Sequence, residues 1–105
     1  MNSLEIILGF KASLYELYNQ RELLLTLEEV HSIYRMLDLL NTPIKEEDKE
    51  EVLKALEITA IALQRKIDLF SSIDKAKTYY SNLLETTLDL HEKIENDKKF
   101  DLSQY

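Results

Sequence analysis

Cysteine, glycine and proline are the residues that this sequence lacks or nearly lacks. The 105-residue chain has no cysteine, one glycine (Gly9) and one proline (Pro43). Without cysteine there is no disulfide framework and no thiolate metal site, which agrees with a reducing compartment. The turns of β proteins rely on glycine, proline and asparagine–glycine pairs, so their scarcity favours helices joined by short loops.

Long apolar runs are also missing. A membrane-spanning helix needs about 20 consecutive apolar residues, and no run in this chain approaches that length. The N-terminal stretch contains Glu5 and lacks the basic segment with which a signal peptide begins. The sequence therefore predicts a cytoplasmic protein with no transmembrane segment.

Basic residues are outnumbered by acidic ones. The chain has 13 lysines and arginines against 20 aspartates and glutamates, a formal net charge of −7. An acidic chain is repelled by phosphate backbones and by anionic lipid surfaces unless it carries a basic patch. Here the lysines are interleaved with acids, as in residues 45–49. We therefore expect no nucleic-acid partner.

Motifs that carry catalysis or hold a metal are not found in the sequence. There is no G-x-S-x-G element for a nucleophilic serine and no glycine-rich loop to cradle a phosphate. Glu28 and His31 have the spacing of ferritin-like di-iron sites, which need a second such pair. The other histidine, His91, has Leu88 at the matching position. We therefore predict no enzyme activity, no cofactor and no metal.

Two helices are predicted in the first 40 residues. The first covers about residues 4–20, and Lys11 falls inside its apolar arc. Either its amine extends from the edge of that face to water, or it is a functional buried lysine. Thr26 and Glu29 form a T-x-x-E capping box, and Leu25 with Val30 forms a hydrophobic staple at the start of the second helix. The apolar positions are Leu4, Ile7, Leu8, Phe10, Leu14, Tyr15, Leu17 and Tyr18, then Val30, Ile33, Tyr34, Leu37 and Leu40.

A longer helix over about residues 46–70 is predicted to be the buried one, because residues 58–63 contain a single polar side chain. Thr42 is its expected N-cap, with Pro43 at the first helical position. The fourth helix starts after residue 72, capped by Ser71 with Asp74. The predicted seams are Val52, Leu56, Ala60, Leu63, Ile67 and Phe70, then Ile73, Ala76, Tyr80, Leu83, Thr87, Leu90 and Ile94.

The alternating three- and four-residue spacing of the last seam is typical of shallow-angle helix packing. The sequence therefore predicts an all-α fold, a mainly antiparallel four-helix bundle with short loops and a central third helix. Residues 1–96 would form this single domain, and residues 97–105 a polar and aromatic C-terminal tail.

The predicted helices and loops contain more apolar residues than one buried seam per helix requires. The three leucines at 23–25 cannot share one face of a helix, so they either plug the end of the bundle or belong to an exposed contact surface. Ile61 points away from its seam, among polar residues. The acidic run at 46–51 is either a solvated helix start or a docking patch for a basic partner. The candidate partner-binding residues are Leu23, Leu24, Leu25, Met36, Leu39 and Ile61.

His91 lies near the middle of the apolar face of the fourth helix. One interpretation is a core histidine that is hydrogen-bonded to a tyrosine hydroxyl or a backbone carbonyl. The other is a buried pH-sensitive residue that acts as a protonation switch.

These observations favour a small acidic helical protein that acts by binding another protein, as an inhibitor, adaptor or regulator, of bacterial, phage or mobile-element origin. A homodimeric scaffold is an alternative. The size, the four-helix plan and the short polar and aromatic tail at 97–105 are also similar to the enterocin-A-type bacteriocin immunity proteins. That resemblance implies a cytosolic antiparallel four-helix bundle that protects a producer cell.

Overall fold

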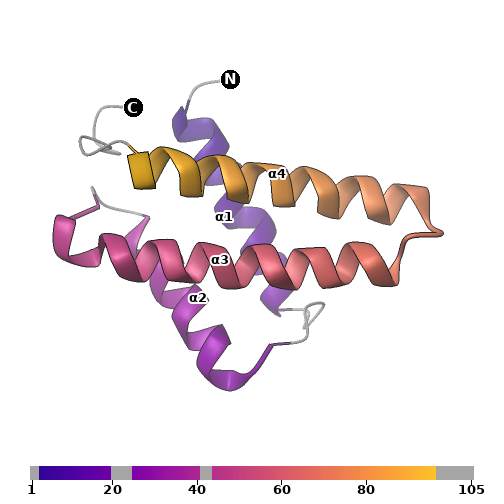
Figure 1. The fold of residues 1–105 in the computed structure, drawn as a ribbon, viewed down its shortest axis with the longest axis horizontal. Coiled ribbons are helices and arrows are strands. Elements are labelled where there is room, and N and C mark those ends of the chain that lie inside the picture. The colour runs from indigo at the N-terminus through magenta and orange to yellow at the C-terminus, as the bar shows by residue number, and fades with distance from the viewer. Residues whose placement is uncertain (1–2, 20–24, 41–43, 97–105) are drawn as a thin grey trace.

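The computed structural model describes residues 3–19, 25–40 and 44–96. Four helices form within these ranges: α1 (Ser3–Asn19), α2 (Leu27–Leu39), α3 (Glu46–Leu69) and α4 (Asp74–Asn96) (Figure 1). The predicted all-α four-helix bundle is confirmed. The central position of the third helix is confirmed as well, since α3 packs most extensively against α4 and next against α2.

The helices form two layers. The molecule measures 41 × 32 × 21 Å, and its smallest dimension equals about two helix diameters. In Figure 1, α3 and α4 lie side by side along their lengths, and α1 crosses behind them. α1 contacts both α2 and α4, and it covers the inner side of the α3–α4 pair (Figure 1).

The start of α2 is the best-defined local feature. The Glu29 backbone N–H donates to Thr26 Oγ1 at 3.1 Å, and the Thr26 N–H donates to Glu29 Oε1 at 2.9 Å. The predicted capping box is therefore confirmed. The bond from the Thr26 backbone N–H is the main cause of a lowered pKa of the Glu29 carboxyl.

The two later helix starts differ from the prediction. The N-cap of α3 is Lys45, without a side-chain cap, so the expectation of Thr42 as N-cap is wrong; Thr42 itself lies outside the described residues. Acidic side chains in the first turn of α3 stabilise its start through the helix dipole instead. The α3–α4 turn is closed by the Ile73 N–H, which donates to the Phe70 carbonyl at 2.9 Å, and α4 begins only at Asp74. Ser71 is therefore too early to be its N-cap.

The core consists of one cluster built from all four helices. Among the predicted seam residues whose side chains the structure describes, two are exposed rather than buried or partly buried: Leu8 is 53% exposed and Ile73 is about half exposed. Leu8 falls beside the face that α1 turns inward, and Ile73 belongs to the turn that precedes α4. The apolar side chains of the cluster are Ile7, Phe10, Leu14, Leu17, Tyr18, Ile33, Met36, Leu37, Leu40, Val52, Ala55, Leu56, Ala62, Leu63, Ile67, Tyr80, Leu83, Leu90 and Ile94.

A polar pair crosses this core between α1 and α3. Thr59 Oγ1 donates to the Ala55 carbonyl at 2.9 Å, so its lone pair is left to accept from the Tyr18 hydroxyl at 3.3 Å. Both side chains are buried. Burial raises the pKa of the Tyr18 phenol, which therefore stays protonated as the donor. The chain of two hydrogen bonds satisfies hydroxyl groups that would otherwise destabilise the core.

Lys11 lies within the apolar arc, as expected, and only 8% of its surface is exposed. Burial lowers the pKa of its ammonium group, and the negative charge of Asp38 on α2 partly opposes that shift.

Candidate protein-binding surface

The six predicted contact residues differ in how deeply the structure buries them. Met36 is fully buried in the core, so its assignment to a contact surface is wrong. The reason is that it shares the inward stripe of α2 with Ile33 and Leu37 rather than lying off the edge of that stripe. Leu25 and Leu39 are half-buried and pack against the core. Leu23 and Leu24 lie outside the described residues.

Among the predicted contact residues that the structure describes, Ile61 is the one that lies mostly in solvent. It is 55% exposed and lies on the side of α3 that faces away from the buried Thr59 and Leu63. A single exposed isoleucine is ordinary in a folded protein. Its surroundings therefore decide whether it has a function, and its role as a partner contact stays a prediction.

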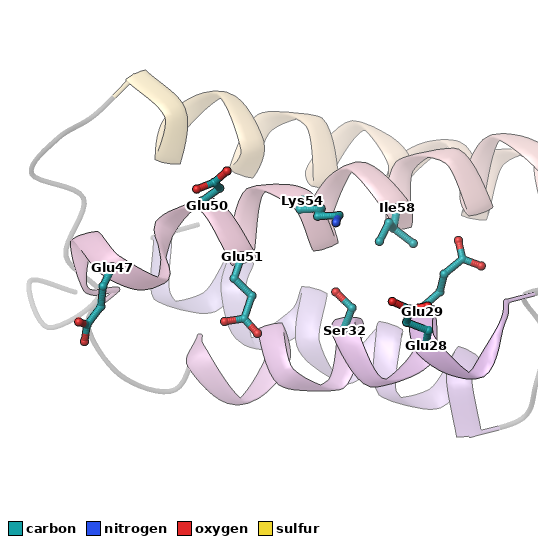
Figure 2. Close-up of a pocket in the computed structure, with 8 residues that line it drawn as sticks. All are labelled: Glu28, Glu29, Ser32, Glu47, Glu50, Glu51, Lys54 and Ile58. Carbon is teal, nitrogen blue, oxygen red and sulfur yellow. The ribbon is translucent and has the colours of Figure 1, made fainter.

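Those surroundings include a groove between α2 and α3 with a volume of about 590 Å³. Figure 2 shows Glu51 of α3 directed toward α2, with Ser32 of α2 between the two helices. Ile58 is the apolar residue in the lining of the groove. The complete lining is Glu28, Glu29 and Ser32 from α2, with Glu47, Glu50, Glu51, Lys54 and Ile58 from α3.

The groove is strongly negative, because five glutamates and one lysine line it. Glu51 is partly neutralised by Arg35, whose Nε lies 3.4 Å from its carboxylate. Glu28, Glu47 and Glu50 form no ion pair with another residue in the described ranges. The groove therefore keeps a net negative charge within the described part of the chain.

Sequence reasoning found only half of this groove. The sequence offers the acidic run at 46–51 as a solvated helix start or a docking patch, and it does not connect the carboxylates of α2 with that run. The available signal was the spacing of Glu28, Ser32 and Arg35, which places a polar stripe on one face of α2. That stripe gave no indication of which helix it would face.

A second groove lies between α1 and α4 and has a different character. Its volume is about 310 Å³, and Glu5 is the acidic residue among its lining side chains. Gly9 leaves open space there, since a Cβ added to it would meet no atom within 4 Å. The lining of this groove therefore carries much less charge than that of the α2–α3 groove.

His91 has other partners than predicted. Its ring is mostly buried at the junction of α4 with α3, where Nε2 lies 3.1 Å from Glu57 Oε1 and Nδ1 lies 3.7 Å from Glu95 Oε2. The expected tyrosine hydroxyl or backbone carbonyl is therefore replaced by two carboxylates. Helical position alone placed the residue near the core, but the edge of the α3 interface lies there.

Within the described ranges, no group of three or more histidine, aspartate or glutamate side chains is arranged to hold a metal ion. His31 is exposed on α2. No helix in the same part of the chain has both the length and the apolar character needed to cross a membrane. Comparison with known protein families, with curated proteins and with solved structures finds no match to this chain.

Proposed function

We propose that this protein acts without catalysis by binding another protein through the outer side of α3 and the groove that α3 forms with α2. The observation that carries the proposal is the position of Ile61 beside that acidic groove. Lys54 and Ile58 line the groove. Ile61 follows them by seven and three residues, so all three share one face of the helix.

This arrangement fits the anatomy of a protein interface. Such interfaces have an apolar centre and a polar rim, and complementary charge steers the partner into register. Ile58 and Ile61 would supply the apolar centre, and the glutamates of both helices would supply the rim. The fitting partner therefore presents lysine or arginine side chains around an exposed apolar residue.

The character of the groove supports recognition rather than chemistry. Glu28, Glu47, Glu50 and Lys54 are exposed side chains, whereas catalytic chemistry commonly requires a site that excludes water. A second copy of this chain is a poorer partner than a basic protein, because self-association through this surface would bring two negative grooves together. An inhibitor, adaptor or regulator of a basic protein is the function that follows.

A matched pair of variants tests the surface. Ile61→Lys places a cation at the proposed centre, and Leu8→Lys makes the same change on α1 at nearly equal exposure. The free energy of unfolding of both variants should lie within about 0.5 kcal/mol of the wild-type value, because both side chains are largely exposed. Each tagged protein is used to capture partners from a bacterial lysate, and mass spectrometry identifies what is retained.

The expected result is one stoichiometric partner that is retained by the wild type and by Leu8→Lys but is lost with Ile61→Lys. With that partner purified, Glu47→Gln with Glu50→Gln should lower the association rate and weaken its dependence on salt. Retention by Ile61→Lys together with loss in Leu8→Lys would place the interface on α1 and refute the proposed surface.

A further inference from the structure

His91 is held between two carboxylates from two helices. Glu57 belongs to the middle of α3, and Glu95 lies one turn after His91 on α4. Only 20% of the histidine side chain is exposed, whereas both carboxylates reach solvent. A cation also approaches this junction, since Lys49 Nζ of α3 lies 3.5 Å from the Glu95 backbone carbonyl oxygen. That lysine contacts the backbone of Glu95 rather than its carboxylate.

The protonation state of the ring decides whether both carboxylates are attracted. A neutral imidazole carries one N–H, so when Nε2–H donates to Glu57 the Nδ1 lone pair faces the Glu95 carboxylate. A protonated ring has an N–H on both nitrogens and a positive charge. It can then donate to Glu57 and form an ion pair with Glu95 at the same time.

We propose that Glu57, His91 and Glu95 form a proton-dependent clamp that fastens the last turns of α4 to α3. The clamp is tight when His91 is charged and loosens when the ring loses its proton. Its stabilising contribution is therefore larger when the ring is protonated than when it is neutral. The clamp is independent of the partner surface proposed above, because none of its three residues lines the α2–α3 groove.

The test is the change in melting temperature between pH 8 and pH 5.5, followed by circular dichroism. The absolute change is not informative, because a chain with a net charge of −7 also loses self-repulsion at lower pH. The comparison is therefore between His91→Gln and His31→Gln, since His31 is an exposed histidine on α2. Glu57→Gln and Glu95→Gln remove one carboxylate charge each and alter side chains that reach solvent.

The gain in melting temperature on acidification should be smaller in His91→Gln than in His31→Gln by about 2–5 °C. Glu57→Gln and Glu95→Gln should each lose part of the same gain. An equal gain in the two histidine variants would overturn the clamp. So would a loss confined to His91→Gln, because the carboxylates would then not be its partners. If His91→Gln fails to fold, full retention of the gain in both glutamate variants overturns it as well.

Discussion

Tyr18 and Thr59 form a buried hydrogen-bonded pair. Which residue is the donor decides how much each substitution should lower the free energy of unfolding. Tyr18→Phe removes the donor and leaves Thr59 still donating to the Ala55 carbonyl. Thr59→Val keeps the shape of the side chain but removes the acceptor of the tyrosine hydroxyl. Because Tyr18 is buried, that hydroxyl would have neither a protein partner nor ready access to water.

The two single variants should therefore differ. Loss of one ordinary hydrogen bond destabilises a protein by about 1 kcal/mol, whereas a buried polar group left without a partner costs about 1–3 kcal/mol. Tyr18→Phe should fall in the first class and Thr59→Val in the second. The double variant removes both hydroxyls together, so it should be less destabilised than the sum of the single variants.

Urea unfolding followed by circular dichroism measures all four proteins of this cycle. Unchanged denaturant slopes would show that the free energies of unfolding are comparable. The expected coupling energy is about 1 kcal/mol, in the direction that makes the pair stabilising. Strict additivity of the two substitutions, within about 0.3 kcal/mol, would refute a Tyr18–Thr59 hydrogen bond that contributes to stability.

Two further predictions concern α2 and the buried lysine. Thr26→Ala should lower the free energy of unfolding by about 1 kcal/mol in denaturant melts, because it removes the side-chain cap of α2. Because the pKa of Glu29 is lowered, its carboxylate stabilises the folded state above the ordinary glutamate pKa, and this stabilisation is lost as the pH falls through the lowered value. Glu29→Gln should therefore flatten the acid limb of the stability profile below about pH 4.5. The lowered pKa of Lys11 has the same sign of effect in the alkaline range, since the folded chain releases this proton before the unfolded chain does. Wild-type stability should rise relative to Lys11→Met as the pH approaches about 10, and identical alkaline limbs would contradict the lowered pKa of Lys11.

The elements of the fold could be predicted because their signals are local. The capping box of Thr26 and Glu29 depends on residues three positions apart, and the seam of α4 from Tyr80 to Ile94 repeats within each turn. Such signals require no knowledge of the neighbouring helix. This is why the number of helices, their approximate bounds and most of the buried side chains follow from the pattern alone.

The candidate site could be predicted only in part, because it depends on how separate helices face each other. A helical wheel gives the angle of a side chain on its own helix but not the rotation of that helix in the bundle. Met36 was therefore assigned to the surface, although the inward stripe of α2 includes it. The contact between His91 and Glu57 joins residues 34 positions apart and has no counterpart in any local pattern.

The contact of α1 with α4 has a consequence for the order of assembly. The α3–α4 pair has the most extensive packing, and a short turn joins its two helices, so only a small loop must close for it to form. The α1–α4 contact instead brings together opposite ends of the chain, with the larger entropy of loop closure that such a distance implies. We therefore expect α3 and α4 to associate early and α1 to dock late. Local unfolding of the native protein would then begin with the release of α1, ahead of the α3–α4 hairpin, which contains the α3 part of the proposed partner surface.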